Sequence, residues 1–264
     1  MGKKIAIIGG GNLGTAIAEG LLKSKFSKPA ELTVTKRNTS TLADLEKKGV
    51  GVSSDNSAAI KKSDIIVLAV KPWQVADVLE GVKKDLNSKK LLISVVTGSM
   101  INDMAEAVGK KMPLFRAMPN TAIAIQQSMT CICSQDASAA DIKYVNELFS
   151  CVGKVVTIDE KLMDAATVLG ACGTAYAMRY IRANIQGGIE IGFDAATASL
   201  IAAQTVKGAA ELLLQKGSHP EQEIDKVTTP KGCTIAGLNE MEHRGFSSSL
   251  IRGVVASYNK IAKD

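Results

Sequence analysis

The sequence is poor in the side chains that bind metal ions or stack on nucleic-acid bases. Its 264 residues include two His, one Trp, four Tyr and five Phe. No spacing of Cys, His, Asp and Glu is typical of a metal site, so we expect none. The formal net charge is +6, but the lysines fall in scattered pairs at expected helix ends and turns, where they solvate the surface. With so few aromatic residues for base stacking, nucleic acid is not an expected partner.

CxxC pairs and long apolar runs are also absent. The cysteines are Cys131, Cys133, Cys151, Cys172 and Cys233. An odd number of cysteines without a CxxC pair favours reduced thiols in the cytoplasm. The longest stretch without a charged residue, 117–135, contains Pro119 and Asn120, which is not typical of a helix that spans a bilayer. We therefore expect a cytoplasmic protein that does not have a membrane as a partner.

Residues 4–14 combine an apolar strand pattern with a glycine-rich turn. The run 4–8 leads into Gly9, Gly11 and Gly14 at G-x-G-x-x-G spacing, and an Ala-rich helical pattern follows. Gly9 permits the tight turn, Gly11 lets the backbone approach a pyrophosphate, and Gly14 lets the helix pack close to the strand. The helix N-terminus, at Asn12 and Leu13, supplies free N–H groups. The pattern predicts a dinucleotide site.

The residues after the second expected strand, 31–35, indicate which dinucleotide is preferred. An acidic residue there would bond the ribose 2′-hydroxyl and repel a 2′-phosphate. This sequence has Lys36, Arg37 and Asn38 instead, followed by two hydroxyl residues. Arg37 can offer a planar, bidentate fork to a phosphate. We hypothesise that NADPH is the preferred cofactor, with NADH possible; the alternative interpretation is a solvated basic turn.

Short apolar runs alternate with helical patterns up to about residue 158. Further strands are expected at 65–70, 91–95 and 114–117, and helices at 39–48, 55–62, 73–85, 99–109 and 138–151. This alternation predicts an α/β fold whose N-terminal domain, 1–158, is a Rossmann-type doubly wound parallel sheet. In such a sheet the ligand lies beyond the carboxyl ends of the strands. The loops after Val70, Val95 and Ala117 should therefore face it.

The strand signal stops after residue 158, which predicts an all-helical second domain over 159–264. One helix is expected to begin at Asp159, one to run from the capping residue Asp194 to Gly217, and a last one to follow Phe246. Apolar residues lie around much of the circumference of 195–214. A helix that is apolar on several sides must be buried on several sides. We therefore expect a second subunit to cover it in a homodimer.

Two glycine-containing stretches of the helical half are candidates for chemistry. In 169–176, two glycines interrupt one long helical pattern. In 228–238, Pro230 disfavours helix at the preceding residue, Gly232 allows a tight turn, and an apolar helix restarts at Ile235. The free amides at such a start can hold a small anion, for example a carboxylate. The alternative is a turn that only caps the helix.

These motifs resemble those of the pyrroline-5-carboxylate reductase family over essentially the whole chain. The matching pieces are Gly9–Gly14, Asn56, Ala69-Val70-Lys71-Pro72, Met118-Pro119-Asn120-Thr121, Ala175-Tyr176, Thr229-Pro230, Gly232 and Thr234-Ile235. The resemblance implies an oxidoreductase that reduces the cyclic imine of 1-pyrroline-5-carboxylate to L-proline with NAD(P)H, the last step of proline biosynthesis. It also implies that the helical domain interlocks into a dimer, which is often assembled further.

The resemblance also implies which residues form the site. The cofactor would be bound by Gly9, Gly11, Asn12, Leu13, Gly14, Lys36, Arg37, Asn56, Ala69, Val70, Lys71, Pro72, Met118 and Asn120. The imine's carboxylate would be bound by backbone amides of a loop that contains Thr229, Lys231, Gly232, Cys233 and Thr234. The catalytic residue would be Thr234, whose hydroxyl hydrogen-bonds the ring nitrogen. Such chemistry needs few side chains, because a protonated imine is already electrophilic and has only to be held against the nicotinamide.

The sequence departs from the family pattern at several places. The family's Ser-Gly-Ser-Gly-Pro-Ala-Tyr is replaced by residues 170–176, a glycine of the substrate loop by Lys231, and the usual Thr or Ala by Cys233. If that glycine has a positive φ, Lys231 carries strain of about 1–3 kcal/mol; alternatively, its ammonium reaches the substrate carboxylate. Two further interpretations of the function stay open. The chain is either a reductase for a related cyclic imine or a non-catalytic NADPH-binding protein. A β-hydroxyacid dehydrogenase would need a lysine within 162–191, and there is none.

Overall fold

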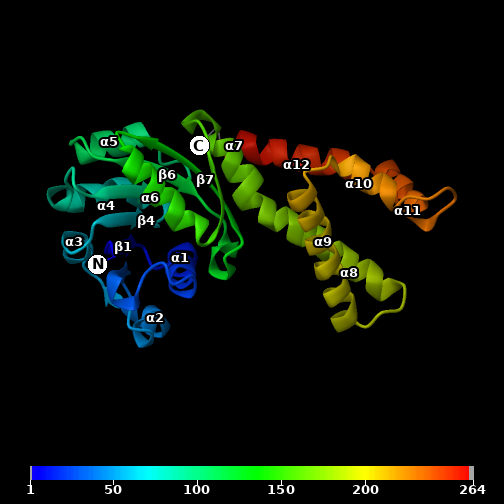
Figure 1. Ribbon diagram of the computed structural model, residues 1–264, viewed down its shortest axis with the longest axis horizontal. Coiled ribbons are helices and arrows are strands. Elements are labelled where there is room, and N and C mark those ends of the chain that lie inside the picture. The colour runs from blue at the N-terminus through cyan, green and yellow to red at the C-terminus, as the bar shows by residue number, and fades with distance from the viewer. Residues whose placement is uncertain (1, 262–264) are drawn as a thin grey trace. The chain divides into compact units, whose positions relative to one another are not determined.

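The computed structural model describes residues 2–261, which divide into two compact units between Cys172 and Gly173 (Figure 1). The first unit contains an eight-stranded sheet in the order β3-β2-β1-β4-β5-β6-β7-β8. Its strands are β1 Ile5–Ile8, β2 Leu32–Thr35, β3 Gly51–Ser53, β4 Ile65–Leu68, β5 Leu91–Ser94, β6 Leu114–Met118, β7 Ser128–Gln135 and β8 Gly153–Thr157. Its helices are α1 Asn12–Lys23, α2 Ala43–Lys47, α3 Asn56–Lys61, α4 Val75–Val82, α5 Ile101–Val108, α6 Ala139–Ser150 and α7 Met163–Ala166.

Helices cover both faces of this sheet, because alternate residues of each buried strand point to opposite sides. In β1, Ile5 and Ile7 join one apolar core, which also contains side chains of α1, α2 and α6. Ala6 and Ile8 join a second core with side chains of α3, α4, α5 and α7. All four β1 residues are fully buried. This confirms the expected doubly wound fold and explains why its central strands are apolar throughout.

Two strands, β7 and β8, run opposite to the other six and so differ from the expected all-parallel arrangement. β7 pairs antiparallel with β6, whereas β8 pairs parallel with β7. A short 3-10 turn, Thr121–Ile125, reverses the chain between β6 and β7. The strands β3, β7 and β8 were not expected from the sequence. β7 has buried polar residues such as Thr130 in place of an apolar run, so its sequence carries little strand signal.

The start of the predicted helical region belongs to the first unit. Glu160–Leu162 forms a 3-10 turn that leads into α7, and a π-helix follows over Thr167–Cys172. The expected interruption of a long helix at Gly170 is therefore a π-helical turn, a local widening of the helix. The division at Cys172 rests on compactness alone. The domain boundary at 158/159 stays a prediction, and residues 1 and 262–264 of the two predicted domains lie outside the described residues.

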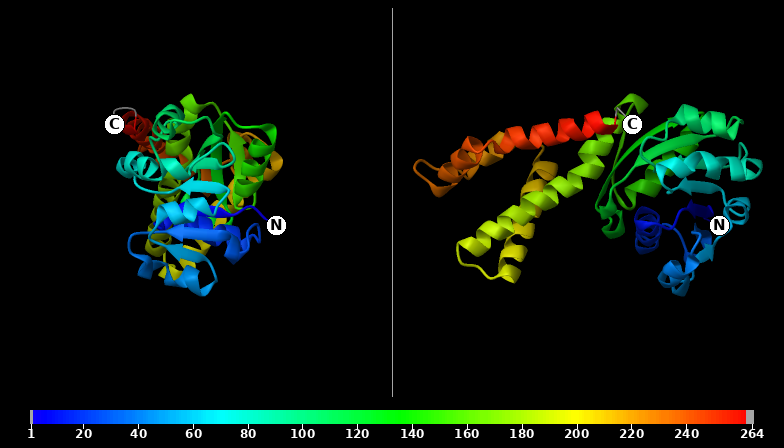
Figure 2. Two further views of the ribbon diagram at one scale, coloured as in Figure 1. Left: turned by 90° about the vertical axis from the view of Figure 1, so that its left-hand side faces the viewer. Right: turned by 180° about the vertical axis from the view of Figure 1, so that it is seen from behind.

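The second unit is built from helices α8 Gly173–Glu190, α9 Ala195–Lys216, α10 Pro220–Lys226, α11 Cys233–His243 and α12 Phe246–Ile261. Figure 2 shows α8 and α9 packed side by side. The expected caps of α9 are confirmed: Asp194 Oδ1 accepts hydrogen bonds from the amides of Ala196 and Thr197 at 3.0 Å each, and Gly217 ends the helix at φ +64°. The bonds from Thr197 and Ala196 lower the pKa of the Asp194 carboxyl.

Large apolar side chains of the second unit are exposed in the single chain. Leu200 of α9 is 71% exposed and Leu214 is 70% exposed. Such a set of apolar side chains is more than a soluble helix ordinarily leaves in water.

Among residues 2–261 there is no helix with the length and apolar character needed to cross a bilayer.

Candidate active site

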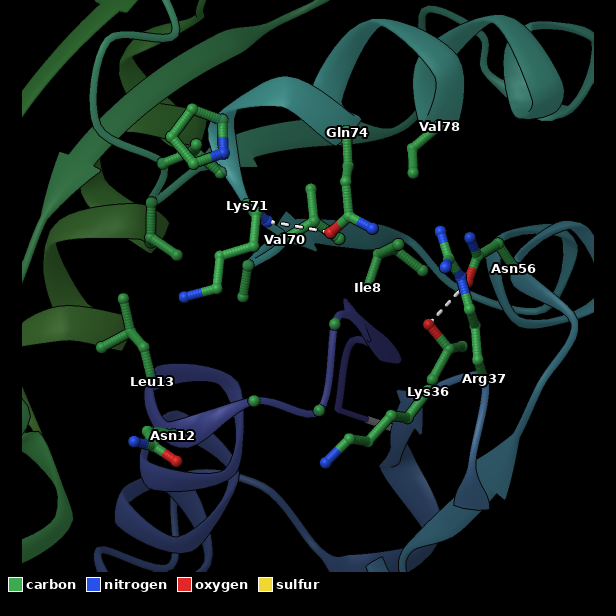
Figure 3. Close-up of a pocket in the computed structure, with 18 of the residues that line it drawn as sticks. Ile8, Asn12, Leu13, Lys36, Arg37, Asn56, Val70, Lys71, Gln74 and Val78 are labelled. Carbon is green, nitrogen blue, oxygen red and sulfur yellow. Dashed lines mark hydrogen bonds between the residues drawn. The ribbon is translucent and has the colours of Figure 1, made fainter. Parts of the chain in front are cut away.

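A cavity of about 790 Å³ opens at the carboxyl ends of β1, β2, β4 and β5 (Figure 3). It lies where β1 has β2 on one side and β4 on the other, so the strand order reverses there. This is the switch point at which open α/β sheets bind ligands. Its walls come from the loop after β1, the basic residues after β2, residues 69–72 after β4 and residues 95–97 after β5.

The glycine loop is shaped by close backbone contacts. Gly9 has φ +114°, and a Cβ there would lie 2.5 Å from the carbonyl oxygen of Ala69. A Cβ on Gly14 would lie 2.0 Å from the carbonyl oxygen of Gly9. Gly11 is different, because a Cβ there would meet no atom of the described residues within 4 Å. The loop is thus tightly packed at Gly9 and Gly14. It is open at Gly11, where a ligand can approach the protein backbone closely.

The N-terminus of α1 completes this cradle. Its N-cap, Gly11, has no side chain to bond the first amides of the helix. Those amides have no partner within the helix, and they carry the positive end of its dipole. The free amides and the positive charge of this cradle therefore suit a pyrophosphate group.

Two cations mark one end of the cavity. Lys36 and Arg37 follow β2 and line the cavity at the edge where Asn56 lies (Figure 3), and neither forms an ion pair with an acidic residue among residues 2–261. Beneath them, the Thr35 hydroxyl donates to Asn56 Oδ1 at 2.6 Å, which joins β2 to the start of α3. Asn38 Oδ1 accepts the amide and hydroxyl of Ser40. A 2′-phosphate would meet two free cations and no acidic residue at this end.

The structure places most predicted cofactor residues on the cavity wall. Gly9, Gly11, Asn12, Leu13, Lys36, Arg37, Asn56, Ala69, Val70, Lys71 and Pro72 line it. Gly14 lies beneath Gly9, Met118 is buried in the core, and these two do not line it. Nor does Asn120, whose amide donates to the Gly170 carbonyl oxygen at 3.1 Å. The roles of all these residues in binding stay predictions.

Several lining residues are not among those predicted to bind the cofactor. They are Ile8, Gly10, Thr35, Asn38, Ser54, Gln74, Val78, Val95, Val96, Thr97 and Thr121. Val95–Thr97 follow β5, and the rule that loops after strands face the ligand identifies that loop. Gln74 Oε1 accepts a hydrogen bond from the Lys71 amide at 3.2 Å (Figure 3). That bond depends on the 3-10 turn Pro72–Gln74, where the sequence pattern predicts a helix from residue 73.

The predicted substrate loop, in the second unit, forms a tight turn before α11. The Gly232 amide donates to the Thr229 carbonyl oxygen at 2.9 Å, which closes a β-turn whose third residue, Lys231, has φ +62°. A Cβ on Gly232 would lie 2.5 Å from Thr229 Oγ1. α11 begins at Cys233, two residues before the expected start, and Thr234 is in its first turn, half-buried. Its N-cap Gly232 supplies no side-chain cap, so the first amides of α11 are available to an anion.

Lys231 therefore occupies a left-handed backbone position that favours glycine. We expect Lys231→Gly to raise the free energy of unfolding by about 0.5–1 kcal/mol, because relief of strain exceeds the added freedom of the unfolded chain. Lys25→Gly is the matched control, since Lys25 is exposed with φ +61° outside both candidate sites. Urea unfolding should show a gain in both variants; no gain in either would contradict a strained lysine. A rise in KM for Lys231→Gly alone would show that its ammonium assists substrate binding.

Three buried or half-buried cysteines of the first unit are not suited to nucleophilic chemistry. Burial raises the pKa of Cys131 and Cys151. Burial, with a smaller contribution from the charge of Glu160, raises the pKa of Cys133 to about 11. A thiol is a nucleophile only as thiolate, so these three act as packing residues. Within residues 2–261, no group of three His, Cys, Asp or Glu side chains has the geometry to hold a metal ion.

Comparisons with known proteins agree with this geometry. A family model described as pyrroline-5-carboxylate reductase dimerisation matches residues 160–264, and one described as NADP oxidoreductase, coenzyme F420-dependent, matches residues 4–98. Pyrroline-5-carboxylate reductase 2 of Dictyostelium discoideum is 42% identical over 99% of this chain and 93% of its own length. Pyrroline-5-carboxylate reductase 1 of the same organism is 46% identical over 98% of this chain, which spans about half the length of that relative.

Solved structures show the same relation. The pyrroline carboxylate reductase of Plasmodium falciparum, solved with NADP bound, has a TM-score of 0.90 at 30% identity and is covered over 97% of its length, with 98% of this chain matched. The pyrroline-5-carboxylate reductase of Coxiella burnetii has a TM-score of 0.90 at 28% identity, over 100% of this chain and 98% of its own. Because a reductase of this family is 42% identical to this chain over 93% of its own length, the chain belongs to the pyrroline-5-carboxylate reductase family.

Proposed function

We propose that this chain reduces 1-pyrroline-5-carboxylate to L-proline with NADPH, the last step of proline biosynthesis. The observation that carries the proposal is the cavity over β1, where an open glycine cradle is continuous with two unpaired cations. A cradle of this kind fits a pyrophosphate, and the cations fit a 2′-phosphate. The Plasmodium falciparum relative, solved with NADP bound, supports the same cofactor here.

NADPH is the preferred form in this proposal, and NADH remains usable through the same cradle. We expect Arg37→Gln to weaken NADPH binding by about tenfold to a hundredfold, the value of one charge-assisted hydrogen bond. NADH, which has no 2′-phosphate, should bind with nearly unchanged affinity. Fluorescence titration with both cofactors measures this, and Arg244→Gln, which removes an exposed arginine paired with Glu240 in α11, is the control. An equal loss for NADH would contradict a 2′-phosphate contact.

The substrate part of the proposal rests on the turn Thr229–Gly232 and the start of α11. The amides of Cys233 and Thr234 are proposed to hold the substrate carboxylate, with Thr229, Lys231 and Gly232 shaping the turn. The Thr234 hydroxyl hydrogen-bonds the imine nitrogen and thereby orients the ring. When bound, the reduced nicotinamide supplies the hydride. The chain's own task is to hold the imine carbon in place and exclude water, which accounts for much of such a rate enhancement.

A homodimer in the cytoplasm completes the proposal, with assembly beyond the dimer left open. The family model for the dimerisation region matches from residue 160 onward. The exposed apolar side chains Leu200 and Leu214 of α9 support a second copy as the partner that covers them. Free cysteines at all five positions support a reducing compartment.

The decisive experiment is NADPH oxidation, followed optically, with purified protein and racemic pyrroline-5-carboxylate. Saturable turnover would support the proposal. A parallel assay with cyclic imine carboxylates of other ring sizes tests the alternative of a related substrate, which the family relation does not favour. No turnover with any imine, together with intact NADPH binding, would contradict an active reductase and favour a binding protein.

A further inference from the structure

A buried arginine interrupts the apolar strand β6. Arg116 is 2% exposed and lies on the face of the sheet that α4, α5 and α7 cover. Its Nη1 is 3.0 Å from Glu160 Oε1 and 3.1 Å from Met100 Sδ. Its Nη2 is 3.7 Å from Asp164 Oδ1, an ion pair without a hydrogen bond. We refer to Arg116, Glu160 and Asp164 as the Arg116 cluster.

The Arg116 cluster also holds the start of α5. Glu160 Oε1 accepts the Ile101 amide at 2.7 Å in addition to the guanidinium of Arg116. Ile101 is the first residue of α5 and is buried. The chain from β5 to Ile101 includes Val95–Thr97, which line the cofactor cavity. Glu160 Oε1 thus connects Arg116 of β6 to Ile101, the residue at which the loop after β5 ends.

A second connection fixes the loop after β6 to the same segment of chain. Asn120 donates to the Gly170 carbonyl oxygen in the π-helix at 3.1 Å, and its Oδ1 accepts the Ala122 amide at 3.0 Å. Between these, Thr121 lines the cavity. The loops 95–100 and 119–121 are therefore both anchored to residues 160–170. Both loops contribute to the end of the cavity that is opposite Lys36 and Arg37.

Stability alone is a weak explanation for this arrangement. A buried ion pair often contributes no more than apolar residues of the same volume, and Nε and Nη2 of Arg116 form no hydrogen bond within the described residues. We infer that Arg116 is a positioning residue, which through Glu160 holds the start of α5, and with it the loop 95–100, beside the loop 119–121, where the nicotinamide half of the cofactor must be placed. Arg116 itself does not line the cavity. The inference rests on the proposed use of NADPH.

The test compares the two halves of the cofactor in Arg116→Lys and Arg116→Met. The fragment 2′,5′-ADP contains the adenosine half without nicotinamide, so its affinity should stay within about twofold of wild type. NADPH affinity and kcat should each fall about tenfold or more, because small misplacements of a reacting group are costly. Isothermal titration calorimetry measures the affinity of either ligand without a chromophore.

Conservative variants keep the test valid if Arg116→Met does not fold. Glu160→Gln retains an acceptor for the Ile101 amide. It should therefore lower kcat and NADPH affinity less than Glu160→Ala does. Lys143→Met removes an exposed cation of α6 and should match wild type. Equal weakening of 2′,5′-ADP and NADPH, or no change of kcat and affinity in folded variants, would overturn the inference. Because the affinity ratio needs no turnover, a failure of the proposed imine reduction would be seen separately.

Discussion

Gly14→Ala is expected to destabilise the first unit and to prevent dinucleotide binding. The new methyl carbon would lie 2.0 Å from the Gly9 carbonyl oxygen and 3.3 Å from Ile7 Cγ2. The first of these is backbone and cannot rotate away, so α1 must move off the loop. Such overpacking costs about 1–3 kcal/mol or more in a well-packed core. The cradle would open with it, and NADPH affinity should fall by at least about a hundredfold.

Two further alanine variants separate the clash from the ligand contact. Gly81→Ala makes the same change inside α4, where a Cβ would meet no described atom within 4 Å, so stability should rise by about 0.5–1 kcal/mol. Gly11→Ala also makes no clash, so it should fold with a stability change within about 1 kcal/mol and yet weaken NADPH binding. Urea unfolding and fluorescence titration measure both effects. Unchanged stability and affinity in Gly14→Ala would refute a fixed cradle.

Thr234→Ala is expected to lower kcat/KM by about tenfold to a hundredfold, since a hydrogen bond to a charged group contributes about 1.5–3 kcal/mol. NADPH affinity should not change, because the glycine cradle is untouched. Thr234→Ser keeps the hydroxyl and should recover most of the activity. Thr228→Ala is the matched control, as the Thr228 hydroxyl donates to the Ile224 carbonyl oxygen at 2.8 Å and serves the end of α10.

Steady-state kinetics and folding measurements together decide this prediction. The four proteins, wild type included, should unfold at similar urea concentrations. If Thr234→Ala retained full kcat/KM, the hydroxyl would have no part in orienting the imine. If Thr228→Ala lost as much as Thr234→Ala, the effect would arise from disturbance of the turn.

The glycine loop could be predicted from the sequence because every residue that determines it is local. Gly9, Gly11 and Gly14 lie between a strand and a helix that both show clear periodicity. A positive φ at position 231 is one of two possibilities that the sequence leaves open, and the structure shows it in Lys231; the turn of Thr229 to Gly232 involves only four consecutive residues. Local patterns of this kind specify backbone conformation without help from the rest of the fold.

Features that depend on distant partners could not be predicted. β7 is defined by its pairing with β6, and its own residues are mostly small or polar. Arg116 appears in the sequence as one charge in an apolar run, and its partners lie far along the chain, at 160 and 164. Pairing and burial of this type are set by tertiary structure, which overrides local propensity.

The contacts of residues 160–172 bear on how this chain can be recombined with its relatives. The family model for the dimerisation region begins at Glu160, yet Glu160 is bonded to Arg116 and Ile101, and Gly170 to Asn120. A chimera joined at 158/159 would leave a buried arginine facing residues of foreign origin. A junction between Cys172 and Gly173 keeps these bonds within one parent. For domain exchange, the natural cut therefore follows the π-helix.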